Sequence, residues 1–212
     1  MKTLFIIPFF YISLFLQAQE INPGHIDQND TIIKYIGFTV CFDTLKKAPH
    51  YSSYYLSYSR LHGSHIRGDY FQPDYSFYKW MPRFRDFIIK GYDHGHLTPA
   101  QDMRWNVLSE SQSFYFSNIA PQEHNFNIGT WKDLEFYTRS FLFNWDTVKI
   151  ITGINFSNTF IPSNFWKIIC TPVKCFYYIC PNQSTSLRYY KFEVIPDTFF
   201  NHVTLIRVKI HY

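Results

Sequence analysis

An acid, two imidazoles and a glycine follow one another at Asp93, His94, Gly95 and His96. Imidazole titrates near neutrality, so a histidine in this block could take a proton from water or give one to a leaving group. A single histidine is more often a hydrogen-bonded core residue than a catalyst. Acid–base chemistry at this block therefore requires further polar residues close to it.

Two polar clusters follow the block, one at residues 117–122 and one at Asn127, Trp131 and Glu135. The second has the spacing i, i+4 and i+8, which would place its three side chains on one face of a helix. An amide oxygen and a carboxylate on one rigid element could serve Mg²⁺, which keeps several of its own waters. The alternatives are an ordinary helix N-cap for Asn127 and plain surface charge for Glu135.

These blocks resemble the DNA/RNA non-specific endonucleases, whose ββα-metal (His-Me) finger carries Asp-Arg-Gly-His, then Asn-x-x-Pro-Gln, then Asn-x-x-x-Trp-x-x-Leu-Glu. Residues 127–135 match the last pattern in full, whereas His94 stands where the family most often has arginine. An Arg-x-x-x-Phe-x-x-Asp pattern at 67–74 and an Ile-Pro-x-x-Phe-Phe pattern at 195–200 also match. The resemblance covers roughly residues 50–200.

The resemblance implies a role for each of these residues. His96 would be the general base, and Asn127 would be the single protein ligand to Mg²⁺ or to another divalent cation such as Mn²⁺. Glu135 would orient a metal-bound water as a further catalytic residue. The other expected roles are catalytic support through hydrogen bonds for Asn118, phosphate contact for Arg67 and His94, and structural support of the site for Asp93, Gly95 and Trp131.

The histidine at position 94 removes a permanent charge that the family pattern would supply. Activity would survive if His94 is protonated, or if Arg67 and Arg104 provide the charge instead. A charged His94 and a neutral His96 would together give a narrow pH optimum near neutrality. Alternatively, His94 is a structural replacement that carries no functional charge.

The resemblance implies an α+β fold, in which helices pack on an antiparallel β-sheet and a ββα-metal finger is present. It also implies that Asp93 to His96 lie at the end of a short strand. Apolar periodicity predicts a helix at 127–144. Alternating polar and aromatic residues predict a strand at 113–119. β-Branched and aromatic runs predict further strands at 31–40, 51–58, 149–153, 168–178 and 188–195.

The N-terminus is typical of a secretory signal peptide. Lys2 precedes an apolar run from Leu4 to Leu16, and the small residue Ala18 follows it. This pattern predicts cleavage after Ala18, with Gln19 as the alternative, a single nuclease domain at 19–212, and a secreted or periplasmic protein without a permanent membrane anchor. An uncleaved anchor is the alternative.

The cysteines are Cys41, Cys170, Cys175 and Cys180. In an exported protein an even number predicts at least one disulfide, and four cysteines allow three pairings. The last three lack the close pairs and histidines of a zinc site, so a structural role is expected.

Composition adds little to these inferences. The net charge of +4 agrees with a polyanionic substrate, but no run of Lys and Arg is present. The motifs thus predict a secreted Mg²⁺-dependent endonuclease that cuts DNA and RNA with little sequence preference. The alternatives are a catalytically weakened nuclease scaffold that binds nucleic acid, and a structural cell-envelope protein suggested by the 21% aromatic content.

Overall fold

The computed structural model describes residues 29–203 except 62, 64–67, 69 and 157–159. A seven-stranded antiparallel sheet with the order β1-β2-β3-β6-β7-β8-β9 forms its centre, and β4 pairs with β5 in a separate two-stranded sheet. The strands are β1 Asp30–Lys34, β2 Phe38–Asp43, β3 Ala48–Ser57, β4 Tyr92–His96, β5 Ile119–Glu123, β6 Thr147–Phe156, β7 Pro162–Cys170, β8 Cys175–Pro181 and β9 Glu193–Val194.

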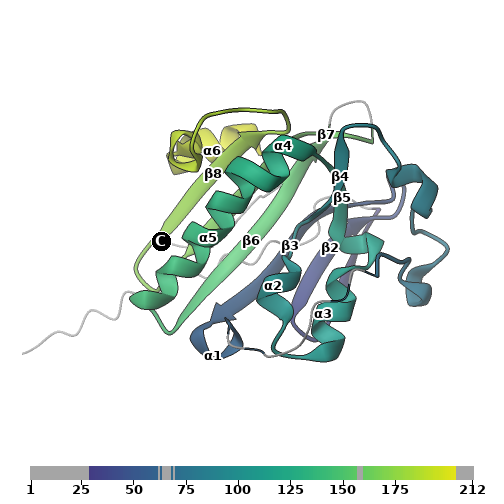
Figure 1. Cartoon of the computed structure of the whole chain (residues 1–212), viewed down its shortest axis with the longest axis horizontal. Helices are drawn as coiled ribbons and strands as arrows, with labels where there is room; N and C mark the ends of the chain where they lie inside the picture. The colour runs from purple at the N-terminus through teal and green to yellow at the C-terminus, as the bar shows by residue number, and fades with distance from the viewer. Residues whose placement is uncertain (1–28, 62, 64–67, 69, 157–159, 204–212) are drawn as a thin grey trace, which may run out of the picture.

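The helices are short, and α5 lies in front of the sheet along β6 in Figure 1. The α-helices are α1 Tyr58–Leu61, α2 Ala100–Met103, α3 Val107–Ser113, α4 His124–Phe126, α5 Lys132–Ser140 and α6 Pro196–His202. The segment Asn127–Trp131 is a π-helical turn between α4 and α5. The 3-10 turns are Tyr75–Phe77, Phe84–Phe87, Phe116–Asn118, Phe141–Phe143 and Tyr189–Phe192.

Both faces of the large sheet are covered. Successive side chains of a strand point to opposite faces, so the apolar run of β7 can fill two cores. Phe165 packs in the same core as Leu134 of α5, whereas the next residue, Trp166, packs with Phe199 of α6. Helices α5 and α6 therefore lie on opposite faces of the sheet.

This mixed architecture confirms the predicted α+β fold with a mostly antiparallel sheet, but several predicted elements are wrong. The predicted strand 31–40 is two strands, because the chain turns back between Tyr35 and Phe38. The Tyr35 N–H donates a 2.8 Å hydrogen bond to the Phe38 carbonyl across this turn. The predicted strand 113–119 is the end of α3 and a 3-10 turn. Asn106 starts α3 by accepting a hydrogen bond from the backbone N–H of Ser109.

Two further predictions fail in part. The predicted strand 188–195 pairs only at β9, because Tyr189 stacks on Tyr137 of α5, with ring centroids 4.8 Å apart, instead of joining the sheet. The predicted helix 127–144 is interrupted at Gly129, whose φ of −107° and ψ of −106° are not helical, and it ends in a 3-10 turn. A residue without a Cβ tolerates such a break most easily.

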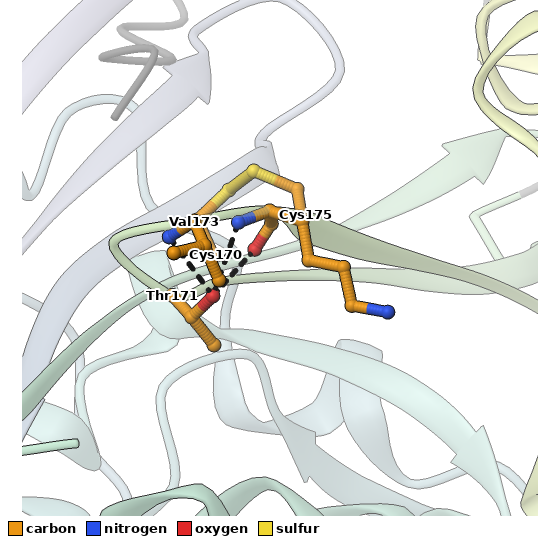
Figure 2. Close-up of a disulfide and its surroundings, with 5 residues drawn as sticks. Cys170, Thr171, Val173 and Cys175 are labelled. Carbon is orange, nitrogen blue, oxygen red and sulfur yellow. Dashed lines mark hydrogen bonds between the residues drawn. A yellow bond between two sulfur atoms is a disulfide. The ribbon is translucent and has the colours of Figure 1, made fainter. Parts of the chain in front are cut away.

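A disulfide joins Cys170 at the end of β7 to Cys175 at the start of β8 (Figure 2). The two residues are direct partners in the antiparallel register. Between them Thr171 Oγ1 accepts hydrogen bonds from the backbone N–H groups of Val173 and Lys174. The structure thus contains the disulfide expected from the cysteine count, while Cys41 and Cys180 are buried thiols.

The expected signal peptide at residues 1–18 lies outside the described residues. Within the described part of the chain, no helix is long and apolar enough to cross a membrane.

Candidate active site

The hairpin of β4 and β5 carries the Asp-x-Gly-His block. Gly91, with a φ of 85°, turns the chain into β4, where a residue with a side chain would be strained. Gly95 lies opposite Ala120, and a Cβ on Gly95 would come within 2.5 Å of the Gln122 side chain. Close approach of the two strands, rather than a positive φ, thus requires glycine at position 95.

An open cleft of about 770 Å³ lies between this hairpin and the face of α5. It brings together His94, His96, Asn127 and Glu135, which are separated by up to 41 positions in the sequence. The other residues that line it are Phe71, Tyr92, Asp93, Pro99, Ala100, Gln101, Ile128, Lys132, Phe136 and Arg139.

Asp93 holds two residues of the segment that leads into α5. Its carboxylate lies 3.0 Å from His124 Nδ1, and its Oδ2 accepts a 2.8 Å hydrogen bond from Asn127 Nδ2. Because Asp93 occupies the amide nitrogen of Asn127, the amide oxygen is the atom left to face the cleft. An uncharged oxygen beside the carboxylate of Glu135 fits the donor set that Mg²⁺ or Mn²⁺ takes from proteins.

Asn118 is buried and does not line the cleft. Its Oδ1 accepts a 2.9 Å hydrogen bond from the Thr98 N–H, and its Nδ2 donates to the carbonyls of Thr98 and Ser113. The Asn118 carbonyl also accepts from the Leu97 N–H at 2.9 Å. These bonds fix the chain directly after His96, so Asn118 can act on the site by positioning it and has no path to a substrate.

Trp131 does not share a face with Asn127 and Glu135, so that prediction is wrong. The indole is 1% exposed and packs in the core against Phe126 and Phe165, with ring centroids 5.6 and 5.5 Å away. The π-helical turn with its non-helical Gly129 rotates residues 127 and 131 away from ideal helical spacing. Trp131 thus supports the base of α5.

Arg139 is a cleft residue that the motif comparison misses. Its Nε donates a 2.6 Å hydrogen bond to Asp102 Oδ1, and its Nη2 lies 3.5 Å from Glu135 Oε2. Asp102 also accepts a 2.6 Å hydrogen bond from the Tyr54 hydroxyl. The position four residues after Glu135 is the signal in the sequence, because an i, i+4 pair of opposite charge meets on a helix surface.

Glu135 on the cleft wall, whose side chain is 18% exposed, and the buried Lys167 beneath it have opposed pKa shifts. Burial raises the pKa of Glu135, and the nearby cations Lys167 and Arg139 oppose that rise. Burial lowers the pKa of Lys167, whose Nζ donates to Thr152 Oγ1 at 3.0 Å and lies 4.8 Å from the centre of the Trp131 ring. A buried cation on β7 therefore accompanies the carboxylate of Glu135.

His94 lies among phenylalanine rings. The centroids of Phe71, Phe84 and Phe87 are 4.6, 5.5 and 5.5 Å from the His94 ring. Burial lowers the pKa of His94, and the neighbouring Asp93 only partly opposes this. The shift favours the neutral imidazole. The cations that line the cleft are Lys132 and Arg139. Arg67 lies outside the described residues, and Arg104 bonds Gln101 at 3.2 Å.

Comparisons with known proteins agree with these motifs. The sequence model of the DNA/RNA non-specific endonuclease family matches residues 18–202. The mitochondrial nuclease EXOG of Homo sapiens is 24% identical over 73% of this chain and 50% of its own length. EXOG of Xenopus laevis is 30% identical over 57% of this chain and 34% of its own length. The chain thus matches about a third to a half of these relatives.

The fold has a solved counterpart. A crystal structure of an EndoG/EndoGI complex superposes with a TM-score of 0.77 at 22% identity, covering 90% of this chain and 89% of that chain. This similarity supports the fold.

The expected secreted or periplasmic location is wrong. The relatives that contradict it are mitochondrial by name, including the nuclease EXOG of Homo sapiens and the mitochondrial nuclease of Saccharomyces cerevisiae, which is 36% identical over 35% of this chain and 23% of its own length. A basic residue followed by an apolar stretch does not by itself separate export from other targeting.

Proposed function

Because this chain belongs to the DNA/RNA non-specific endonuclease family, we propose that it is a divalent-metal-dependent endonuclease that hydrolyses the phosphodiester bonds of DNA and RNA with little sequence preference. The observation that carries the proposal is the meeting of His96, Asn127 and Glu135 in one open cleft. An open cleft can admit a polymer at an internal bond, as an endonuclease requires. We further propose that residues 19–212 form one nuclease domain.

His96 is the general base of the proposed reaction. Its ring is held between Phe71 and Phe114, with centroids 5.4 and 4.9 Å away, and the following backbone is fixed by Asn118. A restrained imidazole loses little further entropy in the transition state. His96 in its neutral form takes the proton from the attacking water.

Asn127 would be the protein ligand of a bound divalent cation, and Glu135 would orient its water shell. When bound, a Mg²⁺ or Mn²⁺ ion supplies Lewis-acid stabilisation of the negative charge on the phosphate and the leaving oxygen. Asp93 orients the Asn127 amide, and Arg139 holds the Glu135 carboxylate on its side of the cleft. The chain's own contribution is thus a fixed amide oxygen and a fixed carboxylate at one end of the cleft.

Among the residues that the structure describes, Lys132 and Arg139 are the cations that line the same cleft. Lys132 lies on the first turn of α5, and Arg139 lies near its end. Arg139 already pairs with Asp102 and Glu135, so the exposed Lys132 is the charge that can attract the phosphate backbone without reading bases, which suits a nuclease with little sequence preference. Binding should weaken as the salt concentration rises.

The test is digestion of plasmid DNA and of a structured RNA with Mg²⁺, with and without EDTA. Asn127→Ala should lose most metal-dependent cleavage. Asp133→Asn is the matched control on the same helix, because Asp133 pairs with Arg188 at 3.0 Å and does not line the cleft. Equal metal dependence in Asn127→Ala and Asp133→Asn would remove Asn127 from the site.

The same experiment distinguishes an active nuclease from a catalytically weakened scaffold that only binds nucleic acid. Such a protein would retard labelled DNA in a gel shift yet release no nicked or linear plasmid with Mg²⁺ or Mn²⁺. Cleavage that EDTA abolishes and excess Mg²⁺ restores supports the nuclease.

A further inference from the structure

A second group of metal-ligating side chains lies at one corner of the large sheet, away from the cleft. Asp30 begins β1, Asp43 ends β2, and His50 lies near the start of β3. One ligand atom from each lies within 4.8 Å of the others. His50 Nε2 is 3.0 Å from Asp30 Oδ1 and 3.5 Å from Asp43 Oδ2. We call these three residues the β1–β3 corner.

A β-bulge places His50 in this corner. In the pairing of β2 with β3, Cys41 lies opposite Tyr51 and Phe42 lies opposite Pro49, so His50 has no partner residue on β2. A bulged residue is re-aimed relative to regular alternation. This explains how Tyr51 and its neighbour His50 are both buried, at 2% and 1% exposure.

The two carboxylates of the corner face each other directly. Asp30 and Asp43 are cross-strand partners in the antiparallel pair of β1 and β2. Like charges at directly opposed positions destabilise a sheet, and here both side chains are at most 2% exposed. Lys46 Nζ lies 3.2 Å from Asp43 Oδ2, but its side chain is 49% exposed. Asp43 Oδ1 also accepts hydrogen bonds from the backbone N–H groups of Leu45 and Lys46, and Asp30 Oδ2 accepts one from the Cys41 thiol. Both carboxylates are thus held close together beside the His50 ring.

The His50 ring supplies the independent observation. Although its Nε2 lies close to both carboxylates, neither contact has the direction of a hydrogen bond, and both ring nitrogens are buried without one. Burial also lowers the pKa of His50. A buried imidazole nitrogen that faces two carboxylates and makes no hydrogen bond is an arrangement that a bound cation would satisfy.

We propose that Asp30, Asp43 and His50 bind a structural Zn²⁺ ion. The separations of 3.0 and 3.5 Å suit ligand atoms about 2.0–2.2 Å from a shared tetrahedral ion. Imidazole argues against Ca²⁺ and Mg²⁺, which prefer oxygen ligands. A water completes the fourth position. The dication neutralises the opposed aspartates and links three strands at the edge of the sheet.

This site is independent of the proposed nuclease chemistry. Asp30 is two residues before Ile32, and Ile32 packs in the core on the α6 face. Asp43 is two residues after Cys41, which packs in the same core. By strand alternation the two aspartates of the corner lie on that face, whereas the cleft lies beside α5 on the other. Zinc at the corner should therefore act on stability and leave cleavage to the cleft.

The experiment strips the purified full chain with chelator, confirms its fold by circular dichroism, and adds Zn²⁺ alone. Calorimetry and metal analysis after gel filtration should show one tightly bound Zn²⁺ in the wild type and in Asn127→Ala. The melting temperature should rise by roughly 5–10 °C when free zinc is about 100-fold above the Kd. His50→Gln and Asp30→Asn should each weaken zinc binding at least about 100-fold and lose the shift.

The two variants change different side chains of the corner, so zinc binding can still be tested with one of them if the other fails to fold. Asp30→Asn changes one atom on an edge strand, and His50→Gln keeps a polar side chain of similar length. Equal zinc affinity in the wild type and in a folded Asp30→Asn would overturn the site. So would zinc binding that Asn127→Ala abolishes, because the ion would then lie in the cleft. Binding of Mn²⁺ in preference to Zn²⁺ would overturn the assignment of zinc.

Discussion

The cleft and the β1–β3 corner both combine histidine with carboxylates, yet their polar atoms are used in opposite ways. In the cleft, Asp93 and Arg139 hold Asn127 and Glu135 from behind and leave ligand atoms facing an open space. In the corner, His50 and its two aspartates are closed off from solvent and face one another. An open site of this kind suits turnover of a large substrate, whereas a closed one suits a resident ion.

Whether a histidine beside an aspartate can bind a cation depends on the hydrogen bonds of the two side chains more than on their residue types. A histidine beside an aspartate occurs at both places. At the cleft, His124 and Asn127 satisfy the Asp93 carboxylate, so that group braces the chain. At the corner, the His50 nitrogens are buried without a hydrogen bond. The arrangement at the corner therefore leaves a buried imidazole nitrogen that can bind a cation.

The largest expected effect is a loss of DNA cleavage that leaves zinc binding at the β1–β3 corner unchanged. His96→Ala should lower kcat/KM for plasmid cleavage by about 10²–10⁴-fold, because positioned proton transfer contributes about that much. DNA binding should stay nearly unchanged, since a base acts in the transition state. Zinc stoichiometry should be unaffected.

The control for His96→Ala is His202→Ala, a histidine on α6 that contacts the Thr198 carbonyl and does not line the cleft. Both variants should melt near the wild-type temperature. Near-normal cleavage by His96→Ala would show that another group is the general base.

A second expected effect compares buried charge beneath the cleft with half-exposed charge at the corner. Lys167→Met removes the buried cation whose charge favours ionised Glu135, and this should cost about 3 kcal/mol, the lower end for a broken buried pair, because Glu135 still contacts Arg139. Lys46→Met removes the half-exposed cation beside Asp43 and should cost at most about 1 kcal/mol. Urea unfolding at pH 7 measures both, and equal losses would show that Lys167 is not paired within the core.

The sequence predicts the cleft far better than the corner. His96, Asn127 and Glu135 belong to short patterns whose spacing is visible, and the structure places all three in one cleft. The contact between Arg139 and Glu135 can be predicted only once both residues are assigned to the same helix. His50 needs the β-bulge, and neither Asp30 nor Asp43 has a neighbour in sequence that indicates a site.

The errors in secondary structure have the same origin. Alternation at 113–119 reads as a strand, but the Asn106 cap starts a helix whose last turn uses the first of those residues. The helical spacing of Asn127 and Trp131 fails because Gly129 adopts non-helical angles. Local patterns report what a segment could form, whereas caps, bulges and packing partners decide what it does form.

A smaller effect concerns the disulfide, which lies apart from both sites. Replacing Cys170 and Cys175 together with serine should cost about 2 kcal/mol, because the loop that the disulfide closes is short. Cleavage and zinc binding should both persist. Thiol titration of the unfolded wild type should find two free cysteines, Cys41 and Cys180, and four free thiols would contradict the disulfide.

The smallest expected effect concerns His94 and sharpens the contrast between a buried and an exposed imidazole. Burial lowers its pKa below the ordinary value of about 6.5, so the ring loses its proton before neutrality as pH rises. Protonation of His94 is also unfavourable to folding, and its contribution to stability is lost as pH falls below the unfolded-state pKa. A charged His94 therefore cannot set the activity on the alkaline side of pH 7.

His94→Arg supplies a permanent charge, which the rings of Phe71, Phe84 and Phe87 can accept through cation–π contact. We expect kcat/KM to rise about 3–10-fold over the whole range above pH 7, in line with one added charge near a phosphate. His94→Gln should superimpose on the wild type there, because both are neutral. Profiles must be measured at fixed Mg²⁺ and fixed salt, since salt alone changes DNA affinity. An alkaline decline near neutrality in the wild type that is absent from both variants would mean that His94 titrates in the working range. The phenylalanine rings would then shield it less from water than their 4.6–5.5 Å centroid distances indicate.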